Sequence, residues 1–94
     1  MTVMRIAITG GSRGIGLATA SACVRAGMSV AIGARDGAQC ASVASELGDG
    51  AVGLALDVRD AEQFDAFLAN AEERIGPLDA LINNAGVVYL GRCR

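Results

Sequence analysis

A glycine-rich segment directly after an apolar run constrains the fold of this chain most. The apolar run over residues 3–8 predicts a buried strand, and residues 9–16 read T-G-G-S-R-G-I-G. Small and apolar residues then recur at helical spacing, which predicts a helix over residues 13–26 that ends before Gly27. A strand, a glycine-rich bend and a helix in this order are the unit with which α/β proteins bind the pyrophosphate of a dinucleotide.

The glycines of this bend have distinct physical roles. Gly10 permits the tight turn off the strand, where a Cβ would clash. Gly14 and Gly16 let the backbone and the helix approach a ligand and the sheet, and the first free N–H groups of the helix favour phosphate. A purely structural turn would also use glycine, but the position between strand and helix favours binding.

The remaining sequence alternates strand and helix patterns without a linker, a repeat or a low-complexity tract. Asp36 and Asp60 each stand three residues before a glutamine, a capping-box pattern that predicts two helix starts. The second of these helices carries the clearest apolar stripe, and Gly76 with Pro77 ends it. The further predicted strands cover residues 29–34, 51–56 and 78–82. This alternation predicts βαβ units in a parallel sheet with right-handed crossovers.

Composition and charge narrow the class of protein. The 94 residues suffice for one small domain, and a hydrophobic content of 52% with a mean hydropathy of +0.42 argues against disorder. The net charge of −2, without a basic block, argues against a nucleic-acid partner. No apolar stretch reaches the ~18–20 residues of a membrane span, and a strand beginning by Val3 leaves no room for a signal peptide. We therefore expect a cytoplasmic protein without a membrane partner.

Cysteine, histidine and lysine usage bears on metal sites and on catalysis. Cys23, Cys40 and Cys93 form no C-x-x-C pattern and the chain has no histidine, so we expect reduced thiols and no metal site. All eight basic residues are arginine, and the chain contains no lysine.

Three motifs in chain order resemble a known family pattern. The glycine-rich segment, Asp57-Val58 after the third strand and Asn83-Asn84-Ala85-Gly86 after the fourth are similar to the N-terminal half of the short-chain dehydrogenase/reductase family, over about residues 3–90. The resemblance implies an α/β fold with a Rossmann-like doubly wound parallel sheet, strand order 3-2-1-4 and three helices, truncated after about four strands. We expect residues 1–94 to form an incomplete dinucleotide-binding domain, with residues 87–94 a tail of uncertain structure.

The resemblance also implies cofactor roles at the strand ends. Asp57 is implied to accept a hydrogen bond from the adenine amino group, with the Val58 backbone beside it, and residues 83–86 to line the inner ribose. The alternatives are a polar residue that closes a strand, for Asp57, and an ordinary turn, for residues 83–86. The cofactor-binding candidates are Gly10, Ser12, Arg13, Gly14, Ile15, Gly16, Arg35, Asp57, Val58, Asn83, Ala85 and Gly86.

The choice between NADP and NAD depends on the end of the second strand. A carboxylate about 20 residues after the glycines selects NAD, whereas an arginine nearby accommodates the 2′-phosphate of NADP. Counting alone offers Asp36 for the NAD role. The family alignment instead puts Ala34 at the acidic position and Arg35 beside it, and it implies Arg13 as a second phosphate ligand. We therefore favour NADP. Solvated surface arginines are the alternative, and an Asp36 turned toward the ribose would reverse the preference.

No catalytic residue is identified in this chain. The resemblance implies hydride transfer between the nicotinamide and a carbonyl or alcohol carbon, carried out by a serine, a tyrosine and a lysine that lie after the fourth strand. Tyr89 is the only tyrosine, and Cys93 stands four positions later, where the motif needs lysine. We expect Tyr89 to follow the strand without a catalytic role, and a carbonyl or alcohol substrate only in a full-length parent.

The expected sheet has an open edge. In the order 3-2-1-4 the strand over residues 78–82 lies where the family pairs a fifth strand, so we expect association through that edge. We also expect exposed hydrophobic surface beside the last helix. Three interpretations follow: the cofactor-binding segment of an NADP-dependent dehydrogenase that is inactive by itself, a non-catalytic dinucleotide-binding module, or a non-functional remnant.

Overall fold

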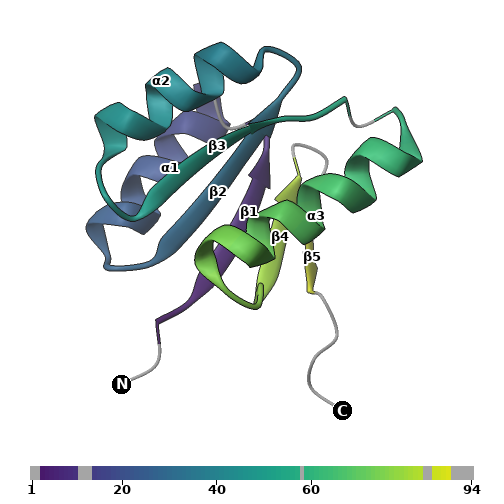
Figure 1. Ribbon diagram of the computed structural model, residues 1–94. Coiled ribbons are helices and arrows are strands. Elements are labelled where there is room, and N and C mark those ends of the chain that lie inside the picture. The colour runs from purple at the N-terminus through teal and green to yellow at the C-terminus, as the bar shows by residue number, and fades with distance from the viewer. Residues whose placement is uncertain (1–2, 11–13, 58, 84–85, 90–94) are drawn as a thin grey trace.

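The alternation of strands and helices is present throughout the computed structural model (Figure 1), which describes residues 3–10, 14–57, 59–83 and 86–89, the last four by their backbone. The elements are β1 (Arg5–Thr9), α1 (Gly14–Arg25), β2 (Ser29–Ala34), α2 (Gly37–Leu47), β3 (Ala51–Ala55), α3 (Ala61–Ile75), β4 (Ala80–Asn83) and β5 (Gly86–Tyr89).

The sheet has the order β3-β2-β1-β4-β5. Its first four strands are parallel, and β1 lies at the centre, where Ile8 pairs with Ile32 of β2 and with Ile82 of β4. The chain proceeds from β1 outward to β3 on one side and then crosses to β4 on the other. The predicted α/β class, the strand order 3-2-1-4 and the three helices are confirmed.

The expectation that the fourth strand lies at the edge of the sheet is wrong. β5 pairs antiparallel with β4, so that Asn83 faces Gly86 and Ala80 faces Tyr89. Two β-branched residues and a tyrosine have side chains that suit a strand, and an antiparallel partner needs only a short connection. Tyr89 therefore lies within a strand rather than after one. Residues 90–94 of the expected tail lie outside the described residues.

Two hydrophobic clusters lie on opposite faces of the sheet. Figure 1 shows α1 and α2 on one face and α3 on the other. Side chains alternate along a strand, so Ile6 and Ile8 of β1 pack in the first cluster and Ala7 packs in the second. The first cluster comprises Ile6, Ile8, Ala20, Val30, Ile32, Cys40 and Ala44. The second comprises Ala7, Ala31, Leu56, Phe67, Ala71, Leu78 and Leu81.

Exposed hydrophobic surface beside the last helix is not found among the described side chains of α3 and the strands. The exposed large hydrophobic residues in the described part of the chain are Val3, Met4 and Ile15. Phe64 and Leu68 of α3 are instead partly buried against the second cluster. One long amphipathic helix thus covers more of this face than we expected.

The predicted helix caps are confirmed. Oδ1 of Asp36 accepts a hydrogen bond from the backbone N of Gln39 at 3.0 Å. Oδ1 of Asp60 accepts from the backbone N of Glu62 at 3.0 Å and of Gln63 at 3.3 Å. The side chain of Gln63, however, accepts a hydrogen bond from the backbone N of Asp57 at 3.1 Å, which the capping-box pattern did not predict. The start of α3 is thereby tied to the end of β3.

The length and polarity of the helices bear on whether any of them could cross a membrane. None of the helices in the described residues combines the length and the apolar character that crossing a bilayer requires.

Candidate functional site

A pocket of about 380 Å³ opens at the carboxyl ends of β1 and β4, beside the start of α1. Its lining residues are Ile8, Gly14, Ile15, Gly16, Thr19, Ile82 and Asn83. The chain continues from β1 to β2, its neighbour on one side, whereas β4 is the neighbour of β1 on the other side. The pocket therefore lies at the point where the strand order reverses. In open α/β sheets this is where ligands bind.

The backbone of the glycine-rich bend is shaped by two glycines with positive φ. Gly10 has a φ of +72°, and its N–H donates to the carbonyl oxygen of Gly33 on β2 at 2.7 Å. Gly14, the first residue of α1, has a φ of +65°. A Cβ at Gly14 would meet no atom within 4 Å, so its backbone conformation, rather than lack of space, favours glycine here. The predicted strand before the glycine-rich segment and the predicted helix after it are confirmed.

The start of α1 gives the pocket both polar and apolar character. The first N–H groups of a helix have no acceptor within the helix, and they carry the positive end of the helix dipole. Ile15, in the first turn, is 85% exposed although it is a large aliphatic residue. Thr19 lies one turn later, and its hydroxyl donates to the carbonyl oxygen of Ile15 at 2.8 Å. The pocket therefore suits an anionic group next to an apolar surface.

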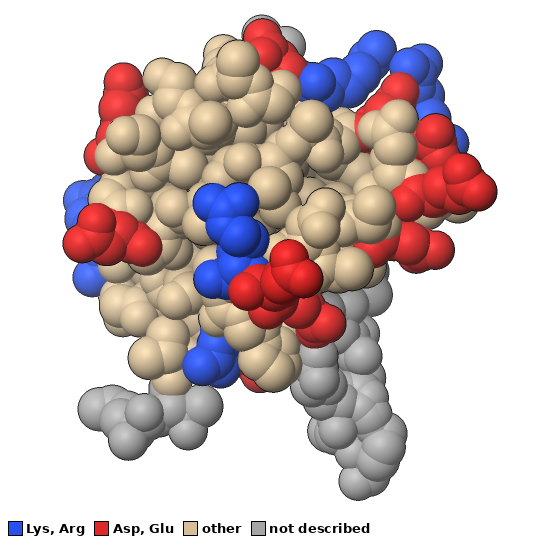
Figure 2. Space-filling model, viewed as in Figure 1, with Lys and Arg blue, Asp and Glu red and all other residues tan. Residues whose placement is uncertain are grey.

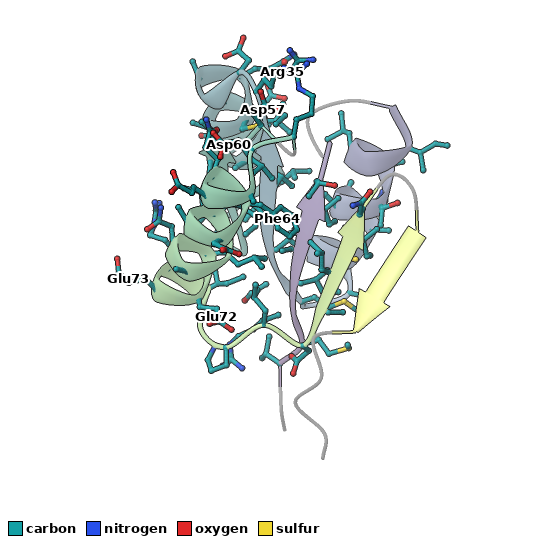
Figure 3. All side chains as sticks on the ribbon, turned by 90° about the vertical axis from the view of Figure 1, so that its right-hand side faces the viewer. Arg35, Asp57, Asp60, Phe64, Glu72 and Glu73 are labelled. Carbon is teal, nitrogen blue, oxygen red and sulfur yellow. The ribbon has the colours of Figure 1, made fainter. Side chains whose placement is uncertain are left out.

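A second polar cluster lies at the carboxyl ends of β2 and β3. Figure 3 shows Arg35, Asp57 and Asp60 near one another at this end of the sheet. Figure 2 shows basic side chains beside acidic ones near the loop between β3 and α3, at the upper right. Arg59 donates through Nε to Oδ1 of Asp57 at 3.1 Å and through Nη2 to Oδ2 at 3.0 Å.

Arg59 controls the ionisation of Asp57. Hydrogen bonds from its side chain and its backbone N–H lower the pKa of the Asp57 carboxyl from 3.8 to about 2. The positive charge of Arg35 adds to this lowering, which puts the guanidinium of Arg35 within electrostatic reach of Asp57. Asp57 is therefore a carboxylate at any physiological pH, with hydrogen-bond acceptors and no donor.

The structure brings the predicted site residues together in two groups at one edge of the sheet. Gly14, Ile15, Gly16 and Asn83 line the pocket, and Gly10 begins the bend that leads to it. Arg35 and Asp57 lie at the ends of β2 and β3, outside the pocket lining. Gly86 is the first residue of β5, opposite Asn83. Ser12, Arg13, Val58 and Ala85 lie outside the described residues.

Several residues of the site were not found from the sequence. Thr19 and Ile82 line the pocket, and Arg59 and Gln63 hold Asp57. Thr19 could have been found, because it follows Ile15 by four residues and so shares its helix face. Among the described residues, no group of three or more His, Cys, Asp and Glu side chains could hold a metal ion.

Comparison with known proteins gives consistent matches. A family described as short chain dehydrogenase matches residues 4–93. 2-(S)-hydroxypropyl-CoM dehydrogenase 3 of Xanthobacter autotrophicus is 44% identical over 89 residues, which cover 92% of this chain and 35% of the relative.

Two solved structures extend the match to three dimensions. 3-Ketoacyl-(acyl-carrier-protein) reductase from Brucella melitensis, complexed with NADH, is similar with a TM-score of 0.79 at 33% identity, covering 83% of this chain and 32% of that one. An NADPH-bound short chain oxidoreductase from Pseudomonas aeruginosa, described as containing an atypical catalytic center, has a TM-score of 0.78 at 37% identity, with coverage of 83% and 32%. The chain thus spans about a third of the length of the relatives it matches.

Proposed function

This chain belongs to the short-chain dehydrogenase family, and we propose that it binds a nicotinamide dinucleotide, NADP in preference to NAD, along the carboxyl edge of its sheet. The observation that carries the proposal is the pocket at the start of α1, where the strand order reverses. Similar structures contain NADH or NADPH, which supports the class of ligand.

The pyrophosphate would lie at the start of α1. The backbone N–H groups near Gly14 and Gly16 supply donors, and the helix dipole favours the negative charge. The positive φ of Gly14 and the open space around it leave the backbone accessible to phosphate oxygens. Ile15 would cover an apolar part of the dinucleotide, a role that suits a large aliphatic side chain with 85% exposure.

The rest of the dinucleotide would follow the strand ends in both directions. We assign Asp57 to the exocyclic amino group of adenine, with the backbone of Val58 beside it. Asn83, Ala85 and Gly86 would line the ribose next to the nicotinamide. Asn83 supports this assignment because it lines the pocket at the end of β4.

The preference for NADP rests on Arg35 and Asp36. Oδ1 of Asp36 accepts from the backbone N of Gln39, so this carboxylate is held at the start of α2 as its cap. Arg35 is exposed directly after β2 and close enough for its charge to act on Asp57. A guanidinium in this place would form charge-assisted bonds to the 2′-phosphate of NADP, and Arg13 is our second candidate for that phosphate.

For the whole protein of which such a segment forms about a third, we propose hydride transfer between NADP(H) and a carbonyl or alcohol substrate. The nicotinamide, when bound, supplies or accepts the hydride. The 94 residues include no lysine, so they would bind and orient the dinucleotide without completing a serine-tyrosine-lysine centre. A non-catalytic dinucleotide-binding module is the second candidate, favoured by the same absence of lysine.

Calorimetric titration with NADPH and with NADH tests the proposal. We expect saturable binding of both, and we expect Arg35→Ala to weaken NADPH about tenfold while changing NADH much less, because only NADPH carries the extra phosphate. Arg74→Ala, which removes an exposed arginine in the last turn of α3, is the matched control and should change neither. Equal losses for the two dinucleotides in Arg35→Ala would contradict the phosphate role.

A further inference from the structure

The carboxylate of Asp57 is held by three hydrogen bonds from a single residue. Oδ1 accepts from the backbone N of Arg59 at 3.0 Å and from its Nε at 3.1 Å, and Oδ2 accepts from its Nη2 at 3.0 Å. The guanidinium therefore donates to both carboxylate oxygens, an arrangement that fixes the plane of the Asp57 carboxylate as well as its position.

The backbone of Asp57 is held as well. Its N–H donates to Oε1 of Gln63 at 3.1 Å, and its carbonyl oxygen accepts from the backbone N of Asp60 at 3.0 Å. Both partners belong to the capped start of α3. Asp57 thus has little freedom, although it lies at the surface and is 26% exposed at its side chain.

The two carboxylate oxygens of Asp57 differ in the number of hydrogen bonds that they accept. A carboxylate oxygen accepts about two hydrogen bonds. Among the described donors, Oδ1 has two partners and Oδ2 has one. With respect to the described donors, one acceptor site on Oδ2 therefore remains for a ligand.

We propose that Arg59 is a positioning residue for adenine: it aligns the carboxylate of Asp57 so that the open acceptor site of Oδ2 takes the exocyclic amino group of the base. This inference rests on the proposed function, since it presumes that a dinucleotide lies along this edge. Arg59 itself need not touch the base. Its contribution is that the acceptor is already ordered before binding, so less conformational entropy is lost when the ligand arrives.

The ionised state of Asp57 adds selectivity for the base. A carboxylate with a depressed pKa, here held down chiefly by the side-chain hydrogen bonds of Arg59, accepts a hydrogen from an amino group and repels a carbonyl oxygen. Adenine offers an amino group at this position, whereas hypoxanthine offers a carbonyl oxygen. The ratio of affinities for the two bases therefore measures how well the acceptor is aligned.

The test compares NADP⁺ with its hypoxanthine analogue on the full chain and on variants. We expect the unaltered chain to prefer adenine by about tenfold, the range of one hydrogen bond to a charged group. Arg59→Ala should reduce the preference to about twofold, mainly by weakening NADP⁺. Arg59→Lys keeps a positive charge but lacks the two N–H donors of the guanidinium, so it should give an intermediate ratio of affinities. This variant remains informative if the alanine variant fails to fold. Arg74→Ala should leave the ratio unchanged.

Each outcome has a defined meaning. A lower ratio in both Arg59 variants supports the inference, whereas a merely structural role would weaken the two ligands equally. An unchanged ratio would overturn it, and a higher ratio would show that Arg59 competes with the base for Asp57. If the unaltered chain binds neither dinucleotide, the proposed function fails and the inference with it. If it binds both but the variants keep its ratio, only the inference fails.

Discussion

Gly14 and Gly27 separate the effect of backbone conformation from that of ligand contact. Their φ values are +65° and +89°, and a Cβ at either would meet no atom within 4 Å. Gly14 begins α1, Gly27 lies in the turn that follows it, and of the two only Gly14 lines the pocket. We expect Gly14→Ala and Gly27→Ala each to lower the free energy of unfolding by about 1–2 kcal/mol, the cost of a left-handed conformation for a residue with a Cβ. Urea denaturation of the unaltered chain and of each variant measures this change in the free energy of unfolding.

Only the first of these variants should affect binding. Gly14→Ala places a methyl group in the space we assign to the pyrophosphate, so it should weaken NADP⁺ under conditions where the variant is folded. Gly27→Ala should bind normally. Similar binding losses in both variants would mean that the effect comes from stability and that the start of α1 is not in contact with the ligand.

The Asp57 carboxyl offers a direct test of the ion pair. Arg59 lowers its pKa to about 2, chiefly through side-chain hydrogen bonds. Because the folded-state value lies below the ordinary one, the pair stabilises the fold above pH 3.8, and this contribution is lost as the pH falls toward about 2. We expect Arg59→Ala to raise the Asp57 pKa toward its ordinary value, as followed by NMR of the carboxyl carbon. An unchanged midpoint would contradict the paired geometry.

Gly33 and Phe67 show how β2 and α3 approach each other. A Cβ at Gly33 would lie 2.6 Å from Cε1 of Phe67, a core residue that is 1% exposed. Gly33→Ala should therefore destabilise the chain by about 1–3 kcal/mol through overpacking. Chemical denaturation of the two single variants and the double variant measures the coupling.

The double variant is the control for this packing. Phe67→Leu alone should also destabilise, because it empties part of the second cluster. Combined with Gly33→Ala it should cost less than the sum of the two, since the shorter side chain makes room for the new methyl group. Strictly additive losses in the free energy of unfolding would mean that the new methyl group and the side chain at position 67 are not in steric conflict.

Local signals explain which elements could be predicted from the sequence. The caps at Asp36 and Asp60, the glycines that end the helices and the apolar stripe of α3 depend on residues a few positions apart, and each of these predictions is confirmed. β5 could not be predicted, because four residues show no period and its pairing with β4 depends on tertiary context. The contact of Gln63 with Asp57 likewise requires knowing how α3 leaves the sheet.

The site was predicted in part for the same reason. Gly10, Gly14 and Gly16 belong to one contiguous motif whose geometry follows from its position between strand and helix. Asn83 was found through a second motif, and the fold brings it to the same pocket. Arg59 belongs to no motif that the sequence analysis recognised, and its hydrogen bonds to Asp57 are found only in the structure.

The molecule uses the two edges of its sheet differently. At the amino edge, Nε of Arg5 donates to the carbonyl oxygen of Ile75 at 2.8 Å, and the backbone N of Arg5 donates to Oδ2 of Asp79 at 2.9 Å. These bonds fasten the end of α3 and the entry to β4 onto β1. The carboxyl edge instead carries the pocket, Arg35 and Asp57. The hydrogen bonds of Arg5 thus lie at the end of the sheet opposite the candidate site.

Amide NMR of the isotope-labelled chain during titration with NADP⁺ tests the central claim most directly. The account predicts saturable shifts at Gly10, Gly14, Gly16, Thr19 and Asn83, which come from the turn after β1, from α1 and from β4 and meet at the carboxyl edge. Gly27, Gly48 and Gly76, at loops away from the pocket, should move little. Titration to saturation with the pocket amides unmoved, or with shifts confined to those loops, would contradict it.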